Sequence, residues 1–285
     1  MTRAVLPVAG LGTRFLPVTR SVPKELLPVL DRPVVEFAVV EALDAGLDEL
    51  IFVVSPGKQA LIEHFRSDPA AEALLERAGR TDALREMRRL AAHATVIAVH
   101  QSAPLGLGHA VWTAAPHTGN DAFAVLLPDN ILVGPDPAIG ALLRVHDKTG
   151  GAVAGLERVP AARTAHYGVC EGTWHGDRLQ VARVIEKPPP GTTDSRHVFV
   201  GRYVLPPRIH PLLAQTRPGR HGELQLSDAL AELASERALT GVQLAARRLD
   251  TGTPLGLLEA TLVLGLSRPD SADGVRALIA RYHQS

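Results

Sequence analysis

The opening segment of the chain is an apolar run that leads directly into a glycine-rich turn. Residues 4–17 read Ala-Val-Leu-Pro-Val-Ala-Gly-Leu-Gly-Thr-Arg-Phe-Leu-Pro. A buried strand followed by such a turn is the start of a βα unit, in which ligands bind beyond the strand end. Gly10 and Gly12 lack the side chains that keep backbone N–H groups away from phosphate oxygens, and glycine accepts positive φ. The segment therefore predicts an α/β fold with an anion site in its first loop.

Two cationic residues accompany this turn. Arg14 lies inside it, and Lys24 follows in a Pro-Lys-Glu-Leu-Leu-Pro segment. Both can donate charge-assisted hydrogen bonds to phosphate. A dinucleotide fingerprint is excluded because Phe15 replaces a third small residue, and a P-loop is excluded because Gly-Thr-Arg replaces Gly-Lys-Ser/Thr. We interpret the turn as a loop for a nucleoside triphosphate, and an ordinary tight βα turn is the alternative.

The rest of the chain alternates strand-length apolar runs with segments of helical period, which predicts βαβ units around a mostly parallel central sheet flanked by helices. We expect one domain over residues 1–285, with residues 1–150 as one half. Residues 151–285 are expected to form a smaller lobe on an extension of the same sheet, followed by C-terminal helices. The expected strands are 4–8, 49–54, 95–100, 122–127, 151–156, 181–185 and 198–205, and the expected helices are 34–45, 58–65, 69–92, 137–146 and 224–236.

Composition limits the classes of function. Lys plus Arg and Asp plus Glu number 30 each, so no general basic field attracts nucleic acid. Cys170 is the only cysteine, which excludes an intrachain disulfide and a multi-thiolate zinc site. No run reaches about 18 uninterrupted apolar residues, as a membrane span would require. We expect a protein that is not exported, resides in the cytoplasm and binds neither nucleic acid nor membrane.

Polar residues that follow apolar strands are the candidates for a site, because ligands in open α/β sheets bind at those ends. Gln101 precedes a second glycine-rich turn that contains Gly106, and its amide can read a pyrimidine edge or simply cap a loop. Asp129 and Asp250 are candidate Mg²⁺ ligands, since Mg²⁺ commonly takes one or two carboxylates plus substrate phosphates. Each aspartate is also a plausible helix cap or turn former.

A third candidate is the Glu186-Lys187-Pro188 segment at the end of residues 181–185. Lys187 can neutralise a sugar phosphate and Glu186 can accept from vicinal hydroxyls, although a solvated ion pair is the alternative. The twelve histidines show no metal-binding spacing. His109 is expected to be the only histidine near the site, with helix packing as its role.

With these segments in hand, the chain resembles the sugar-nucleotide pyrophosphorylases, especially their uridylyl branch, over nearly its whole length. Further shared segments are Gly-Leu-Gly-His-Ala-Val at 106–111, Tyr-Gly-Val at 167–169, Val-Gly-Arg-Tyr-Val-Leu at 200–205 and Glu-Leu-Gln-Leu-Ser-Asp-Ala at 223–229. The resemblance implies a Rossmann-like nucleotidyltransferase fold and a homo-oligomer, a dimer or tetramer. It also implies transfer of the uridylyl group of UTP to glucose 1-phosphate, with pyrophosphate released.

The resemblance also implies the residue roles, position by position. The first half would bind nucleotide, and the second half would bind the sugar phosphate. Ala9, Gly10, Gln101 and Gly106 would hold the uracil; Gly12, Thr13, Arg14 and Lys24 would surround the triphosphate; Gly168, Glu186 and Lys187 would hold glucose 1-phosphate; Asp129 and Asp250 would bind Mg²⁺; Arg14, Lys24 and Asp129 would be the catalytic residues.

One segment departs from the uridylyl pattern. The uridylyl branch usually has Asp-Cys-Gly-Asn-Lys, whereas residues 250–254 read Asp-Thr-Gly-Thr-Pro, as in the thymidylyl branch. A dTTP:glucose-1-phosphate thymidylyltransferase is therefore an alternative, and a non-catalytic nucleotide-sugar-binding regulatory protein is a second. The inserted helices at 69–92 favour the uridylyl branch.

Overall fold

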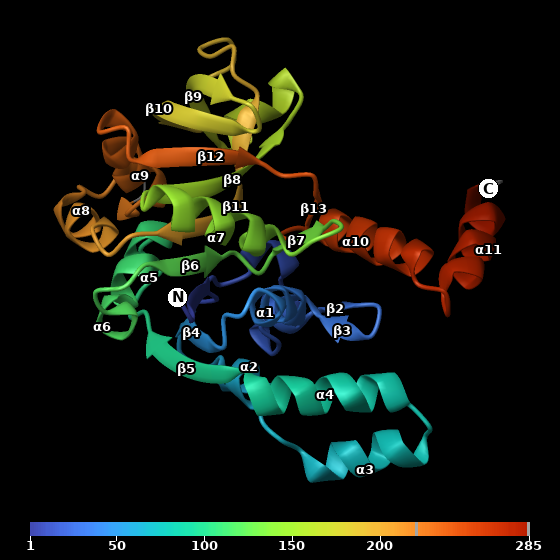
Figure 1. Ribbon diagram of the computed structural model, residues 1–285. Coiled ribbons are helices and arrows are strands. Elements are labelled where there is room, and N and C mark those ends of the chain that lie inside the picture. Colours follow the sequence, from blue (N-terminus) through green and yellow to red (C-terminus); the bar gives the residue numbers. More distant parts are fainter. Residues whose placement is uncertain (220–221, 284–285) are drawn as a thin grey trace.

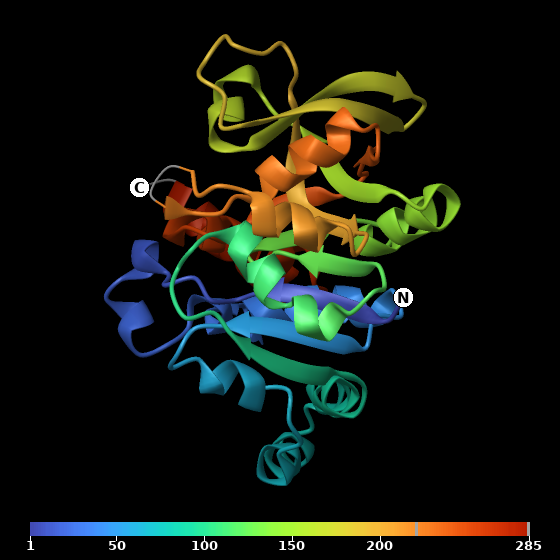
Figure 2. The same cartoon turned by 90° about the vertical axis from the view of Figure 1, so that its left-hand side faces the viewer.

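A computed structural model describes residues 1–219 and 222–283, which form helices on both faces of a continuous nine-stranded sheet (Figures 1 and 2). The spatial order is β5-β4-β1-β6-β11-β8-β12-β10-β9. Only β11 and β10 oppose the other strands in direction, so the sheet is mostly parallel as expected. Its strands are β1 (Arg3–Pro7), β4 (Glu49–Val54), β5 (Thr95–His100), β6 (Phe123–Leu126), β8 (Ala152–Arg158), β9 (Gly168–His175), β10 (Arg178–Glu186), β11 (His197–Leu205) and β12 (Leu239–Gln243).

Two further pairs of strands lie outside this sheet. β2 (Pro28–Val29) pairs with β3 (Arg32–Pro33), and β7 (Asn130–Val133) pairs with β13 (Arg247–Asp250). The α-helices are α1 (Val34–Asp44), α2 (Gln59–Glu63), α3 (Pro69–Arg77), α4 (Thr81–His93), α5 (Leu107–Thr113), α6 (Ala115–Thr118), α7 (Ala138–Thr149), α8 (Ile209–Gln215), α9 (Leu226–Ser235), α10 (Pro254–Ser267) and α11 (Ala272–His283). Short 3₁₀ turns are η1 (Thr13–Phe15), η2 (Val18–Arg20), η3 (Lys24–Leu26) and η4 (Ala161–His166).

The alternation of side chains along the strands produces two cores. In β1, Val5 belongs to the core under α5, α8 and α9, whereas its neighbours Ala4 and Leu6 belong to the core under α1, α2, α4 and α7. This is the period-two pattern of a strand buried on both faces. Strand β1 is therefore packed on both sides, and its carboxyl end is a well-supported position on which a site can be built.

The expected elements are found with small shifts of their ends. The segment expected as one helical excursion at 69–92 is two helices, because Gly79 takes a positive φ of 67° between α3 and α4. The helix expected from residue 224 begins two positions later. The Leu224 N–H donates to the Leu105 carbonyl oxygen, and its own carbonyl accepts from the Gly108 N–H of α5. Figure 1 shows α3 and α4 at one end of the sheet and the β9–β10 hairpin at the other.

Candidate active site

The carboxyl ends of β1 and β6 bring the first loop together with Asp129. Lys24 Nζ donates to Asp129 Oδ2 at 2.7 Å, so the two predicted catalytic residues form an ion pair. Burial would lower the pKa of Lys24, but the carboxylates of Asp129 and Glu25 outweigh it and raise the pKa above its usual value. Burial would likewise raise the pKa of Asp129, and the Lys24 ammonium outweighs this and lowers it. Both groups are therefore charged at neutral pH.

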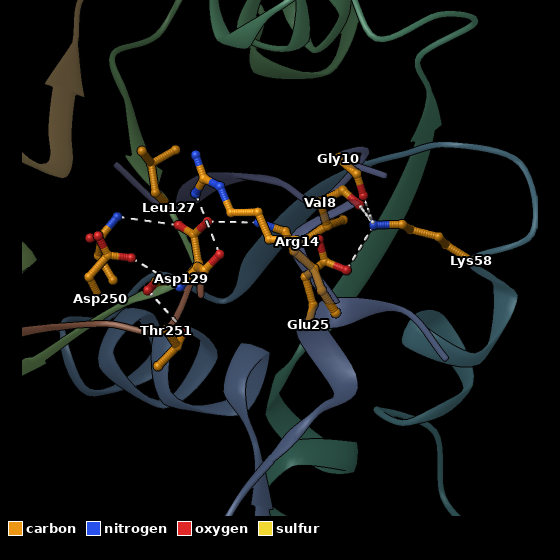
Figure 3. A network of polar contacts seen from close by, with 12 residues as sticks. Val8, Gly10, Arg14, Glu25, Lys58, Leu127, Asp129, Asp250 and Thr251 are labelled. Atoms are coloured by element: carbon orange, nitrogen blue, oxygen red, sulfur yellow. Dashed lines mark hydrogen bonds and ion pairs between the residues drawn. The ribbon is translucent and has the colours of Figure 1, made fainter. Parts of the chain in front are cut away.

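Asp250 reaches the same place through the β7–β13 ladder, in which it pairs with Asn130. Thr251 donates to the Asp129 carbonyl oxygen through its N–H at 2.8 Å and its hydroxyl at 2.9 Å. A Cβ added to Gly252 would lie 3.0 Å from Asp250 Oδ1, 3.6 Å from Arg14 Nη1 and 3.7 Å from Asp129 Oδ2. The two carboxylates and the arginine thus face one point next to Gly252. Figure 3 shows Arg14, Asp129 and Asp250 gathered together.

These carboxylates suit a magnesium ion by their chemistry. Two carboxylates on neighbouring strand ends, without a closed cage of protein ligands, match the way Mg²⁺ is shared between protein and substrate phosphates. Among the described residues, no group of three or more His, Cys, Asp or Glu side chains could hold a metal. Asp129 and Asp250 are the two carboxylates that lie nearest Gly252, and their use by a metal stays a prediction.

The segment that carries Asp129 is held by a buried arginine. Arg202 is 1% exposed and its guanidinium binds Glu41 as well as the carbonyl oxygens of Leu127 and Asn130 at 2.9 and 2.8 Å. Gly201 beside it has a φ of 78°, and a Cβ there would lie 2.9 Å from Leu127 Cβ. A charged residue in an apolar strand thus fixes the turn that presents Asp129.

A cavity of about 380 Å³ lies between the second half of the chain and the charged cluster formed by Arg14, Asp129 and Asp250. Predicted residues from both halves line it, namely Arg14, Asp129 and Asp250 from the charged cluster and Gly168, Glu186 and Lys187 from the β9–β10 hairpin. The structure therefore brings together two groups of residues that the sequence analysis assigned to different substrates.

The Gly168–Glu186 pair forms one wall of this cavity. The two residues face each other in the β9–β10 register, and a Cβ on Gly168 would lie 3.1 Å from Glu186 Oε2 and 2.9 Å from Phe199. Lys187 Nζ lies 3.1 Å from Glu186 Oε1, so the ion pair considered as the alternative is present and also faces the cavity.

The other predicted nucleotide residues lie in the two glycine loops and do not line this cavity. Gly12 has a φ of 64°, and its carbonyl accepts from Thr19 Oγ1 at 2.9 Å. Ala9 and Gly10 directly follow β1, and Thr13 begins η1. A Cβ on Gly10 would lie 3.7 Å from Lys24 Cε, so the lysine side chain runs along this first loop.

The second glycine loop is held by Gln101 and by the segment before α9. Gln101 is 4% exposed, and its Nε2 donates to the Gly106 carbonyl at 3.3 Å and contacts His109 Nδ1 at 2.9 Å. Gly106 has a φ of 96°, and a Cβ there would lie 2.7 Å from the Leu224 carbonyl oxygen. Gln101 therefore supports its loop, as the capping alternative proposed, and its contact with a base stays a prediction.

His109 is not the only histidine near the site, so that expectation is wrong. His166 lines the cavity, because η4 places it just before β9. Its neighbour Tyr167 also lines the cavity and lies under the Arg248 guanidinium, 4.5 Å from the ring centroid. Arg248 binds Glu157 and donates to Asn130 Oδ1 at 3.1 Å. These contacts join residues far apart in the chain. The Tyr-Gly-Val segment at 167–169 was noted in the sequence, but no local pattern marked His166 or Arg248.

Lys58 is a further charged residue that the sequence analysis missed. It follows β4, and its ammonium donates to the carbonyl oxygens of Val8 and Gly10 and to Glu25 Oε2 (Figure 3). The rule of weighing polar residues after apolar strands would have found it. It was missed because it was taken as the first residue of an ordinary helix.

Comparison with known proteins agrees with this geometry. A family model described as nucleotidyl transferase matches residues 3–265. A UTP–glucose-1-phosphate uridylyltransferase from Staphylococcus epidermidis is 38% identical over 97% of this chain and 96% of its own. The protein of that name from Bacillus subtilis is 37% identical over 95% and 93%. A solved UTP-bound UGPase from Acinetobacter baumannii has 36% identity and a TM-score of 0.89, with 99% of each chain covered.

Proposed function

We propose, from the premise that the chain belongs to the nucleotidyl transferase family, that it transfers the uridylyl group of UTP to glucose 1-phosphate and releases pyrophosphate. The observation that carries the proposal is one cavity lined by Arg14, Asp129 and Asp250 on one side and by Gly168 and Glu186 on the other. A donor nucleotide and a sugar phosphate need such a shared space, because their reacting atoms must come within about 3.5 Å.

The reaction we propose needs no general base. A sugar phosphate oxygen attacks the α-phosphorus of UTP, the new P–O bond forms, and the bond to the β-phosphate oxygen breaks as pyrophosphate leaves with the electron pair. The second pKa of a phosphate monoester is about 6, so the attacking oxygen is already anionic at neutral pH. Alignment and countercharge are then the main sources of rate.

Each charged residue has a place in this scheme. Arg14 and Lys24 would offset the charge on the nucleotide phosphates, and Lys187 would offset that of the sugar phosphate. Asp129 and Asp250 would hold Mg²⁺, which supplies further countercharge to the phosphates when bound. Asp129 also orients Lys24 through their 2.7 Å ion pair.

The segment that suggested transfer of a thymidylyl group has structural roles here, and the two relatives described above are named uridylyltransferases. Thr251 binds the Asp129 carbonyl, and Thr253 caps α10 by accepting from the Gly256 N–H at 3.1 Å. Pro254 occupies the first turn of that helix, where proline is favoured. The presence of these three residues is therefore explained by the fold and does not require a thymine base in the site.

The direct test measures pyrophosphate release from glucose 1-phosphate with UTP and with dTTP at equal concentrations, with and without Mg²⁺. We expect turnover with UTP that exceeds that with dTTP and that stops when Mg²⁺ is removed. Faster turnover with dTTP would establish the thymidylyl reaction instead. Binding of UDP-glucose without any turnover would establish a regulatory protein.

The setting of the enzyme is also part of the proposal. We place it in the cytoplasm, where UTP is available, and Cys170 is a buried free thiol. Across the described residues, no helix is long and apolar enough to cross a membrane. We propose that neither nucleic acid nor membrane is a partner, that residues 1–285 act as one domain, and that its halves bind nucleotide and sugar phosphate.

A homo-oligomer is the remaining element of the proposal. The arm formed by α10 and α11 extends from the body in Figure 1, and Leu255, Leu258, Leu278 and Ile279 on it are exposed. A second copy carries the same apolar arm, so burial of one arm against another removes both from water. We expect light scattering to give a multiple of 30.3 kDa and Leu255→Glu to lower it.

A further inference from the structure

Lys58 is a buried cation whose donors are all used by neighbouring groups. The residue is 8% exposed, and Nζ lies 2.7 Å from the Gly10 carbonyl oxygen and 2.8 Å from Glu25 Oε2. The third acceptor is the Val8 carbonyl oxygen. An ammonium group has three donors, so the full set is satisfied. Burial of a charge destabilises a fold unless the charge is fully paired. Here two of the three partners of the ammonium are carbonyl oxygens of the first loop.

Glu25 completes this arrangement from the far end of the loop. It is 2% exposed, and its Oε1 atom is buried without a hydrogen-bond partner. Its Oε2 atom accepts from Lys58, which is therefore the side-chain partner of this carboxylate. Its neighbour Lys24 is the residue that pairs with Asp129. The Lys58–Glu25 pair therefore connects the start of the loop to the segment that carries a predicted catalytic lysine.

The two bonded carbonyls determine where the following N–H groups point. In a trans peptide the C=O and the N–H of one plane point in opposite directions. The Val8 carbonyl shares its plane with the Ala9 N–H, and the Gly10 carbonyl shares its plane with the Leu11 N–H. With both carbonyls directed at Lys58, both N–H groups are directed away from it.

These two N–H groups have no partner in the part of the chain that the structure describes. No hydrogen bond joins the N–H of Ala9 or of Leu11 to a protein acceptor among residues 1–219 and 222–283. Free N–H groups of a glycine loop can bind anionic oxygens. They are thus donors that the fold leaves open for a ligand.

We propose that Lys58, held by Glu25, is a positioning residue that turns the Ala9 and Leu11 N–H groups toward the acceptor oxygens of the bound nucleotide. The inference rests on the proposed function, and it adds a residue that does not itself touch substrate. It predicts that nucleotide affinity depends on Lys58 and that glucose 1-phosphate affinity does not.

The test measures equilibrium binding of UTP and of glucose 1-phosphate by calorimetry in the full chain. Lys58→Met is expected to weaken UTP binding at least about tenfold, as for the loss of one or two well-made hydrogen bonds. Glucose 1-phosphate binding should stay within about twofold. Lys58→Arg retains the cation and should recover part of the loss.

Two matched variants separate positioning from general destabilisation. Lys148→Met removes an exposed lysine on α7, and Leu142→Ala opens a cavity in the core under the same helix. Both should bind UTP like the wild type, although Leu142→Ala lowers Tm. If Leu142→Ala weakens UTP binding as much as Lys58→Met does, or if Lys58→Met binds UTP within about twofold of wild type, the inference is wrong.

A second substitution covers the case in which Lys58→Met does not fold. Glu25→Gln keeps the shape and an acceptor for Lys58 but removes the negative charge that holds the ammonium, and it should weaken UTP binding. Unchanged UTP affinity would overturn the inference. If wild type binds UTP yet releases no pyrophosphate, only the proposed function fails, and if wild type does not bind UTP, both fail.

Discussion

The ion pair between Lys24 and Asp129 allows a prediction whose size follows from its geometry. The atoms are 2.7 Å apart, and the two side chains are 20% and 30% exposed. Coulomb's law gives about 1.5 kcal/mol at the dielectric of water and about 6 kcal/mol at an effective dielectric of about 20. Because both groups retain contact with water, we expect a coupling near the lower limit, about 2 kcal/mol.

The measurement is a double-mutant cycle of Lys24→Met and Asp129→Asn. Urea unfolding of the four proteins gives the coupling free energy, which should fall as salt is raised. Pyrophosphate release from UTP and glucose 1-phosphate gives kcat, and each single variant should lose at least about 100-fold, the effect of removing a transition-state donor. Arg3→Met is a control, since its partner Glu49 lies at the opposite end of β1.

The pH dependence of this coupling provides an independent check. The pKa of Asp129 is lowered, so its contribution is present above the ordinary value of 3.8 and is lost as pH falls through the lowered pKa. The pKa of Lys24 is raised, so its contribution is complete below 10.5 and is lost as pH rises through the raised pKa. A coupling below about 0.3 kcal/mol at pH 7, or near-wild-type kcat in either variant, would refute this reasoning.

Three other predictions concern separate parts of the site. Arg14→Ala should lower kcat at least about 100-fold without a large change in Tm, and unchanged turnover would contradict its assigned role. Gly106→Ala should destabilise the fold by at least about 1 kcal/mol in urea unfolding, since its Cβ would lie 2.7 Å from the Leu224 carbonyl at a φ of 96°; unchanged stability would show that the loop relaxes. Asp250→Asn should raise the Mg²⁺ concentration for half-maximal activity, and an identical Mg²⁺ titration would exclude this carboxylate.

The strand-end rule predicted much of the site from sequence. Gln101 follows β5, Asp129 follows β6 and Asp250 ends β13, and the last two meet at one point near Gly252. For Gln101 and Asp129 the rule works because apolar runs identify parallel strands, and parallel strands end at a common edge. Asp250 is different, because β13 pairs antiparallel with β7 outside the main sheet. Strands β1, β4 and β6 were found because their residues are buried on both faces.

Other parts of the site have no local pattern. The β7–β13 ladder brings together two distant segments, and the Thr251–Asp129 contact at its end joins residues 122 positions apart. Each strand is too short to show an alternation of apolar and polar residues. Arg202 and Lys58 are single charged residues whose roles come from distant carbonyls. Sequence periodicity reports which side of an element is buried, and it does not report which backbone oxygen a buried cation will meet.

The late position of β13 in the chain has a consequence for biosynthesis. A ribosome releases the first loop, Lys24 and Asp129 long before it releases Arg247–Asp250, and β7 has its partner strand only after that point. A nascent chain can therefore assemble most of its sheet while the second carboxylate is still missing. Under the proposed role of Asp250 as a Mg²⁺ ligand, metal-dependent chemistry would begin only when synthesis is nearly finished.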